Sequence, residues 1–390
     1  MTDSPPASDR PHLLTRAKTA LAAGRGVLLA GEAGIGKTRL AGQTRTNHAP
    51  ARIVRLRAHS ASGHLGIFES LLPPSADRTD RPHGFDILER LLAGTPESDT
   101  VLQVDDVHEL DIASAEYLSD LARFHGVRLV LTSRLTPPPH PAVTELWKDG
   151  FLERIDLPRL PPEALLQLAA THTAATRTTP ATLEPDTAQR LVAHAQGNPM
   201  HLLALIDTLT TAGELREHRD LLVWQGGFPR HGSIVDVIRP EIDRLTPQTR
   251  LAFDAVALLG PLQRDLITDL TSPDALDQLE RTDLVEREPA ADRTRPALRV
   301  AHPLYGEVAR TMMTAAATRA LYARAAASAA PRATHDPALA VRVVRWSPEA
   351  GEIPDAALVA GLADAATHAL DAAHAVDLDT ARILPSPPDP

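Results

Sequence analysis

Apolar residues along this chain follow two different periodicities, one before and one after about residue 160. In the first part, short apolar runs of strand type alternate with longer helical stretches. The predicted strands are GVLLA (26–30), RIVRLRA (52–58), TVLQVDD (100–106), VRLVLTSR (127–134) and FLERIDL (151–157). Such alternation is typical of a parallel sheet with helices on both faces. We therefore predict an α/β domain over residues 11–160, preceded by a polar tail over residues 1–10.

The second part of the chain shows apolar spacing near 3.6 residues, which indicates helices. Prolines in LPRLPPE (157–163) interrupt both periodicities, and they therefore mark a domain boundary. Two short helices before an extended segment predict a small winged-helix-like unit, and an alanine-rich helical segment follows it. The four expected segments are a helical lid, the winged-helix-like domain, the helical segment and a tail, over residues 161–244, 245–312, 313–380 and 381–390.

Composition excludes several classes of function. The chain has 390 residues, which is room for two to four domains, and a formal net charge of −10. That charge argues against a general affinity for nucleic acid or anionic membranes, and an aromatic content of 3% argues against base-stacking platforms. The absence of cysteine excludes disulfides, thiolate metal sites and a cysteine nucleophile. The N-terminus lacks a signal-peptide pattern and no run of 18 apolar residues exists, so we expect a soluble, cytoplasmic protein.

The stretch GEAGIGKT at residues 31–38 carries the phosphate-loop pattern G-x-x-x-x-G-K-[ST]. Lysine occurs only at Lys18, Lys37 and Lys148, so a chance match somewhere in this chain is on the order of one in a thousand. An apolar strand before the loop and a helix after it form the required setting. Lys37 is expected to reach the outer phosphates, and the Thr38 hydroxyl to face Mg²⁺. The alternative interpretation is a glycine turn that only joins a strand to a helix.

Two adjacent acids follow another predicted strand in the sequence VLQVDDVHELD. Ligands bind at the carboxyl ends of strands in open α/β sheets, so Asp105 is predicted to hold Mg²⁺, directly or through water. Asp106 would orient or deprotonate the attacking water; the alternative is a surface acid that ends a strand. Asp111 is predicted to be the N-cap of the helix that follows.

Three further positions have both a functional and a structural interpretation. Arg134 ends a predicted strand, where a guanidinium could sense the γ-phosphate or simply be exposed on a loop. The tripeptide GNP at residues 197–199 is accounted for by a glycine that ends one helix and a proline that begins the next. His302 is one of 17 histidines, and a lone histidine is more often packed or solvated than a ligand.

Together these motifs resemble the STAND class of P-loop ATPases. They are most similar to the ATPase core of the large ATP-binding LuxR-type (LAL) transcriptional regulators, which are related to maltose-regulator and NB-ARC proteins. GEAGIGKTRL resembles the family's Walker A, and DDVHELD its Walker B, with Glu109 in the place of an aromatic residue. LTSR resembles the sensor strand, GNP the G-x-P motif, and AHPLYGEVAR the segment that carries the winged-helix histidine. The resemblance covers about residues 9–375.

The resemblance implies a site for ATP or ADP with Mg²⁺, in which Arg134 senses the nucleotide and Pro199 lies against the base. It also implies that His302 touches the β-phosphate in the ADP-bound form. Arg10 is kept from the family's G-R-x-x-E-L segment, whose glycine and acid are absent here. The implied nucleotide-binding residues are Gly31, Glu32, Ala33, Gly34, Ile35, Gly36, Lys37, Thr38, Arg39, Arg10, Pro199 and His302, with Thr38 and Asp105 as Mg²⁺ ligands and Asp106 and Arg134 as catalytic residues.

The expected fold is an α/β P-loop NTPase with an AAA+/STAND-like parallel sheet, followed by an all-helical lid, a winged-helix domain and a helical-repeat stub. The expected function is an ATP-binding regulatory switch with slow Mg²⁺-dependent hydrolysis, which responds to an inducer or protein partner as a monomer or a nucleotide-dependent oligomer. Family members continue into repeats and a DNA-binding helix-turn-helix, whereas this chain ends where repeats begin. We therefore expect a stand-alone module or a shortened regulator, without direct DNA binding. The composition of residues 246–310 supports the expected lack of DNA binding, because this segment contains 8 Arg and no Lys but 11 Asp plus Glu.

Two other functions remain open at this point. A working AAA+ ATPase, such as an origin-binding or remodelling protein, has the same domain order but would turn over rapidly or form a ring. A non-enzymatic interaction module would bind a nucleotide only in order to fold, and Asp106 argues against it.

Overall fold

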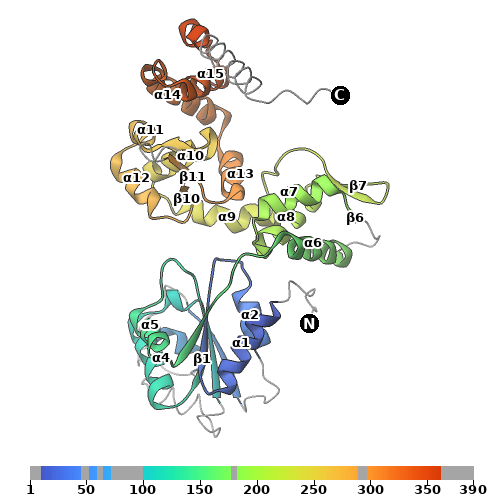
Figure 1. Ribbon diagram of the computed structural model, residues 1–390, viewed down its shortest axis with the longest axis vertical. Helices are drawn as coiled ribbons and strands as arrows, with labels where there is room; N and C mark the ends of the chain where they lie inside the picture. The colour runs from blue at the N-terminus through green and yellow to red at the C-terminus, as the bar shows by residue number, and fades with distance from the viewer. Residues whose placement is uncertain are drawn as a thin grey trace, which may run out of the picture. The chain divides into compact units, whose positions relative to one another are not determined.

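The computed structural model describes residues 10–44, 52–58, 65–71, 100–176, 182–288 and 297–361 (Figure 1). The chain forms two compact units, Met1–Gln225 and Gly226–Pro390. None of the described helices is long and apolar enough to cross a membrane.

A five-stranded parallel sheet forms the centre of the first unit, in the order β2-β3-β4-β1-β5. Each predicted strand is confirmed, with ends that differ by at most one residue. Because all five strands run the same way, their carboxyl ends meet at one edge of the sheet. The strands are β1 (Gly26–Ala30), β2 (Arg52–Arg57), β3 (Thr100–Asp105), β4 (Arg128–Ser133) and β5 (Leu152–Asp156).

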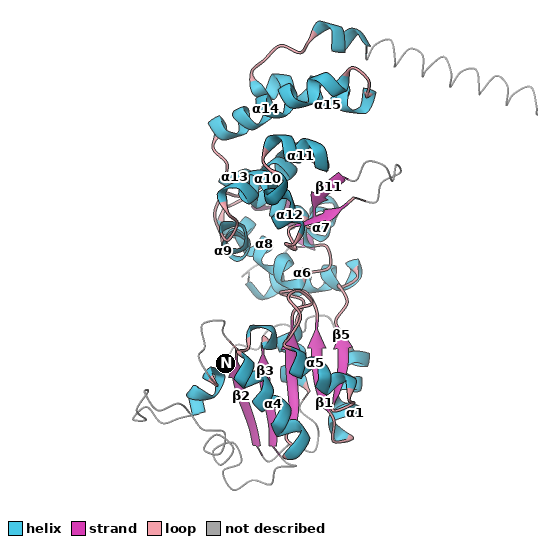
Figure 2. Cartoon of the chain, turned by 90° about the vertical axis from the view of Figure 1, so that its left-hand side faces the viewer, coloured by secondary structure: helices cyan, strands magenta, loops and turns pink. Residues whose placement is uncertain are grey.

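Helices cover both faces of this sheet, as the alternation along the chain predicts (Figures 1 and 2). Successive residues of β1 point to opposite faces. Leu28 packs in the core beneath η1, α4 and α5, whereas Val27 and Leu29 pack in the core beneath α1 and α2. These elements, with the short η3, are α1 (Pro11–Ala22), α2 (Lys37–Gln43), η1 (Gly66–Leu71), η3 (Val107–Glu109), α4 (Ile112–Phe124) and α5 (Pro141–Lys148).

The rest of the first unit is not all-helical, which corrects the expectation for residues 161–244. Three short strands pair in the order β6-β8-β7 beside three helices. The hairpin between β7 and β8 turns at Arg219 and Asp220, both with positive φ, where hairpins usually carry Asn or Gly. The sequence therefore gave no recognisable signal for this hairpin, because β7 and β8 have only four residues each and the turn residues are atypical. The elements are α6 (Pro162–Thr176), β6 (Thr182–Leu183), α7 (Pro185–Ala195), α8 (Pro199–Thr211), β7 (Leu215–His218) and β8 (Leu221–Trp224).

The second unit begins with α9 (Ser233–Asp243), which the sequence assigned to the lid. Helices α10 to α13 surround a three-stranded antiparallel sheet, whose strand order is β10-β11-β9. The two stretches expected to be helical before an extended segment, residues 246–260 and 272–288, contain α10 and α12, whereas α11 between them was not expected. The identity of this part as a winged helix stays a prediction. The elements are α10 (Pro247–Leu259), β9 (Leu262–Gln263), α11 (Arg264–Leu270), α12 (Pro273–Glu280), β10 (Val285–Arg287), β11 (Ala297–Val300) and α13 (Pro303–Met312).

A pair of packed helices follows, α14 (Ala315–Ala333) and α15 (Pro337–Ala350), and residues 356–361 are also helical. Arg332 on α14 holds this pair to α11, because its guanidinium lies 2.8 Å from Asp265 and 2.7 Å from Asp269. The predicted helical segment extends to residue 380, and its part beyond residue 361 lies outside the described residues.

Candidate functional site

The glycine-rich segment between β1 and α2 has the backbone of a tight loop. Gly34 and Gly36 have φ values of 73° and 102°, in the left-handed region that favours glycine. A Cβ on Gly34 would lie 2.6 Å from the Met200 side chain and 2.9 Å from Asn198 Oδ1. Gly34 is therefore required twice, by its backbone conformation and by the close approach of α8. Ile35 anchors the loop in the core, with 2% of its surface exposed.

Lys37 is held within the loop by the loop's own backbone. Its Nζ donates to the carbonyl oxygens of Gly31 at 3.0 Å and Glu32 at 2.8 Å. Burial lowers the pKa of Lys37, while the nearby carboxylate of Asp106 acts in the opposite direction. An ammonium group has three N–H donors, so one remains for a phosphate oxygen.

The two predicted Mg²⁺ ligands lie in direct contact. Thr38 Oγ1 donates to both carboxylate oxygens of Asp105, at 2.9 and 2.8 Å. Thr132 on β4 fixes this carboxylate from the other side, because its hydroxyl donates to Asp105 Oδ1 and accepts from the backbone N–H of Asp106 at 3.0 Å. A hydroxyl and one carboxylate are oxygen ligands that suit Mg²⁺, which takes its remaining ligands from water and phosphate. The donor set therefore fits the predicted metal.

Mg²⁺ sites of this kind need no large acidic cluster. Among the described residues, no group of three or more His, Cys, Asp or Glu could hold a metal ion.

Asp106 has an unusual backbone and an unpredicted partner. Its φ is 59°, in the left-handed region that few residues other than glycine adopt. A guanidinium nitrogen of Arg57 lies 3.3 Å from Asp106 Oδ2. Arg57 is the last residue of β2 and pairs in register with Asp105 on β3. The sequence contained no signal for this pair other than the position of Arg57 at a strand end, which is informative only when the strand order is known.

A buried histidine connects the Walker B segment to the strand that precedes Arg134. The backbone N–H of Arg134 donates to His108 Nδ1 at 3.4 Å, and the His108 side chain is 2% exposed. Burial lowers the pKa of His108, which keeps the ring neutral and Nδ1 able to accept. Arg134 follows β4 and the loop with Lys37 follows β1, and because these neighbouring strands are parallel, both cations lie at the same edge of the sheet. The charge of Arg134 contributes to the lowered pKa of Lys37. The sequence analysis gave His108 no role, although the residue lies within the DDVHELD motif, because a motif does not show which backbone group a histidine contacts.

The first residues of α8 dock against the glycine-rich loop. Asn198, 2% exposed, is the N-cap of α8: its Oδ1 accepts from the backbone N–H groups of Met200 at 3.1 Å and His201 at 3.3 Å. Its Nδ2 donates to the carbonyl oxygen of Ala33 in the loop at 2.8 Å. The Met200 N–H also lies 3.4 Å from the carbonyl oxygen of Gly34.

The segment between β5 and α6 links the two sides, because Arg159 Nη2 lies 2.9 Å from Glu32 Oε1 and Arg159 Nη1 lies 3.4 Å from Gln196 Oε1, just before α8. The helix boundary at residues 197–199 is as predicted, and Pro199 begins α8 beside the loop contact. The second role of Asn198, as a donor to the loop, was missed because an N-cap signal is local, whereas this bond joins residues 165 positions apart.

Arg10 is tied to backbone rather than left open for a ligand. Its guanidinium donates to the carbonyl oxygens of Ile35 at 3.1 Å and Pro158 at 2.6 Å, and burial lowers its pKa. These bonds clamp the glycine-rich loop to the segment after β5. Arg39 lies in the first turn of α2, in the same motif.

His302 lies in the second unit as the N-cap of α13. Its Nδ1 accepts from the backbone N–H of Leu304 at 3.3 Å, and 4% of the residue is exposed. Its ring lies edge-on to Tyr305, whose hydroxyl is 3.1 Å from Glu241 on α9. One ring nitrogen is thus committed to the helix, and the contact with a β-phosphate stays a prediction.

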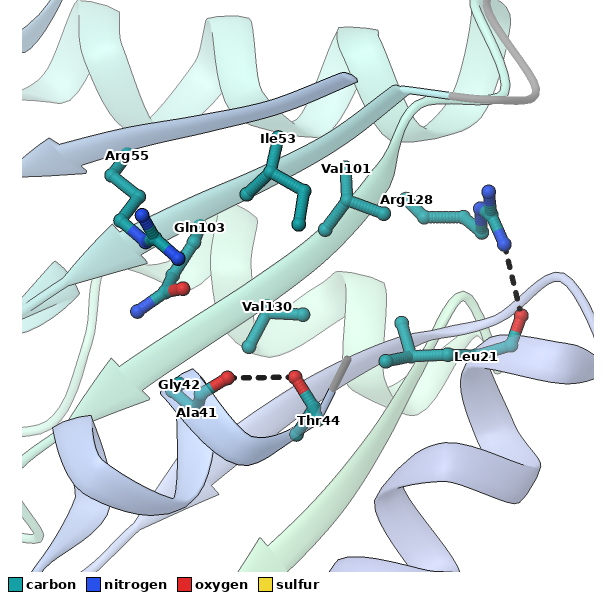
Figure 3. A pocket seen from close by; sticks show the side chains of 10 residues that line it. All are labelled: Leu21, Ala41, Gly42, Thr44, Ile53, Arg55, Val101, Gln103, Arg128 and Val130. Carbon is teal, nitrogen blue, oxygen red and sulfur yellow. Dashed lines mark hydrogen bonds between the residues drawn. The ribbon is translucent and has the colours of Figure 1, made fainter. Parts of the chain in front are cut away.

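Gln103 interrupts the apolar pattern of β3 because it lines a cavity beside α2 (Figure 3). Its register partner Arg55 lines the same small cavity, of about 20 Å³, together with Thr44 and Arg128. The Arg128 guanidinium is 3.4 Å from the carbonyl oxygen of Leu21 (Figure 3). This cavity contains none of the predicted site residues, so the polar strand position is separate from the nucleotide chemistry.

No protein-family model and no curated protein matches the chain. Solved structures do. A STAND protein with a tetratricopeptide repeat sensor from Pyrococcus horikoshii is 18% identical with a TM-score of 0.34; the match covers 93% of this chain but only 51% of that one. Orc1 of Aeropyrum pernix, solved with DNA, is 16% identical over 77% of this chain and 91% of its own, with a TM-score of 0.44.

RuvB of Thermotoga maritima is also 16% identical, over 74% of this chain and 94% of its own, with a TM-score of 0.39. At these levels the comparisons concern the fold alone. The function therefore has to be argued from the residues of the site.

Proposed function

We propose that this chain is an ATP-binding regulatory switch of the STAND type, with slow Mg²⁺-dependent hydrolysis. The observation that supports this most is the meeting of two motifs at one edge of the sheet. Lys37 and Thr38 come from the glycine-rich loop, Asp105 and Asp106 come from the end of β3, and together they have the chemistry that phosphoryl transfer requires.

The loop and its lysine would hold the phosphates. Backbone N–H groups of a glycine-rich loop attract phosphate oxygens, and the Lys37 ammonium already lies against the loop. Thr38 and Asp105 would hold Mg²⁺, which neutralises charge that develops on the phosphates. Thr132 keeps the Asp105 carboxylate in one orientation.

Asp106 would orient the attacking water or accept its proton. Its carboxylate lies against the Arg57 guanidinium, so one oxygen is already engaged. A base that must leave an ion pair before it acts is consistent with slow turnover. Arg134, near enough to Lys37 to influence its pKa, would sense the γ-phosphate.

The switch would work through the docking of α8 onto the loop. Asn198 joins the lid to the segment that would hold the phosphates, and Arg159 contacts both Glu32 in that segment and Gln196 just before α8. Two nucleotides that shape the loop differently can then favour two lid positions, since a ligand shifts an equilibrium by its differential affinity. The proposed setting, a LuxR-type regulator that itself does not bind DNA, rests on the motif resemblance.

Lys37→Ala tests the nucleotide site. We expect it to abolish tight ATP and ADP binding in calorimetry, because the charge on the outer phosphates is lost. Lys148→Ala is the matched control, since Lys148 lies exposed in the last turn of α5. Equal affinities for the two variants would refute the phosphate-loop proposal.

The same site geometry would also serve a working AAA+ ATPase. The two proposals differ in assembly and in turnover. Light scattering with ATP and Mg²⁺ separates them, because a working ring gives a hexamer with rapid hydrolysis, whereas the proposed switch gives slow hydrolysis without a closed ring.

A further inference from the structure

A second candidate binding site lies in the second unit, where α10 ends beside α14 and α15. The cavity measures about 190 Å³, below the range of about 300–1,000 Å³ for drug-sized ligands, so it has room only for a small molecule. Its lining combines apolar and aromatic walls with a few charged groups, which is typical of small-molecule sites. The lining residues are Leu258, Leu259, Tyr322, Arg342, Arg345, Trp346 and Glu349.

Two arginines supply positive charge to this cavity. Arg342 Nη2 donates to the carbonyl oxygen of Leu259 at 2.9 Å, and its guanidinium carbon lies 4.9 Å from the centre of the Trp346 ring. Burial lowers the pKa of Arg342, with Glu288 acting in the opposite direction, so this guanidinium is partly removed from water. Arg345 lies one turn further along α15 and is exposed. Within the described part of the chain, neither arginine pairs with a carboxylate at salt-bridge distance.

The other groups limit what the cavity can hold. Burial raises the pKa of Tyr322, and the charge of Glu349 raises it further, so the hydroxyl stays protonated and can donate at neutral pH. Trp346 is 5% exposed, and with Leu259 it forms an apolar wall. Two arginines and one glutamate leave one net positive charge on the lining, which matches a monoanion better than a phosphate dianion.

We propose that this cavity binds a small organic monocarboxylate with an aromatic or apolar body. The carboxylate would pair with the Arg342 and Arg345 guanidinium groups, whose planar donor arrangement matches two carboxylate oxygens. The apolar body would lie against Trp346 and Leu259. The Arg342–Trp346 stack holds one guanidinium in place before the ligand arrives, which reduces the entropy lost on binding.

Calorimetry on the full chain without nucleotide tests this proposal with 3-phenylpropionate as the probe. We expect a Kd of about 0.1–1 mM, as for other ligands of this size, and binding at least about tenfold weaker for the neutral isostere 3-phenylpropanol. Because no nucleotide is present, the result is independent of the proposed ATPase function.

Variants locate the binding. Arg345→Gln removes an exposed guanidinium and should weaken 3-phenylpropionate about tenfold. Arg319→Gln is the matched control, since Arg319 is exposed on α14 outside the cavity lining. Arg342→Gln should weaken the probe as well, and circular dichroism checks that loss of its bond to Leu259 leaves the helices intact. Absence of probe binding, equal binding of acid and alcohol, or equal affinity of the Arg345→Gln and Arg319→Gln variants would overturn the proposal.

Discussion

The bond between Asn198 and the glycine-rich loop is the contact whose loss should be most informative. Asn198 is nearly fully buried and serves two elements at once: Oδ1 caps α8, and Nδ2 donates to the Ala33 carbonyl at 2.8 Å. Asn198→Ser keeps an effective N-cap, but the shorter side chain cannot cap the helix and reach Ala33 together. Asn198→Ala removes both functions. The two variants therefore separate the cap from the contact with the loop.

The magnitudes follow from the two bonds. A buried carbonyl that loses its donor costs about 1–3 kcal/mol, and loss of an N-cap costs about 1 kcal/mol. We expect Asn198→Ser to lower the free energy of local opening of the loop by about 1–3 kcal/mol, and Asn198→Ala by about 2–4 kcal/mol. At 1.4 kcal/mol per tenfold, the serine variant should exchange loop amides about 5- to 150-fold faster.

Hydrogen–deuterium exchange of the full chain measures this directly. The peptide that covers residues 31–36 reports the loop, and a peptide from α4, on the far side of the sheet, serves as the internal control. Faster exchange confined to the loop and the start of α8 is the expected result. Unchanged loop exchange in Asn198→Ser would show that α8 does not hold the loop, and the route that we propose for the switch would then be wrong.

Three further outcomes are expected. Asp106→Asn should keep ATP bound and slow its hydrolysis, whereas Asp105→Asn should weaken Mg²⁺-dependent binding; unchanged turnover in Asp106→Asn, measured by phosphate release, would remove its catalytic role. His302→Asn keeps a cap for α13 but removes the imidazole. It should lower the affinity for ADP relative to that for ATP by about 10- to 150-fold, which corresponds to one hydrogen bond to a charged group. Equal losses of affinity for the two nucleotides in calorimetry would contradict this. The chain, with its net charge of −10, should show no sequence-specific DNA binding at physiological salt, and sequence-dependent shifts in fluorescence anisotropy would refute this.

The elements that the sequence predicted well are those whose signal is local. β1, β3 and β4 are mainly apolar runs, whereas β2 and β5 mix apolar and charged residues, and the limits of all five follow from consecutive positions. The N-cap at Asp111 was also predictable, because its side chain accepts from Ser114 N–H only three residues away. The hairpin of β7 and β8 was missed for the converse reason, since its strands are short and its turn residues are atypical.

The sequence by itself determined the glycine-rich loop, the paired acids and the strands that carry them, because each is a pattern of neighbouring residues. Only the tertiary structure decided which distant residues meet them. The order β2-β3-β4 brings Arg57 to Asp106 and Thr132 to Asp105. The docking of α8 brings Asn198 to Ala33. Such contacts depend on how strands pair and helices pack, and the free energy that selects one packing is summed over the whole core rather than recorded at any single position.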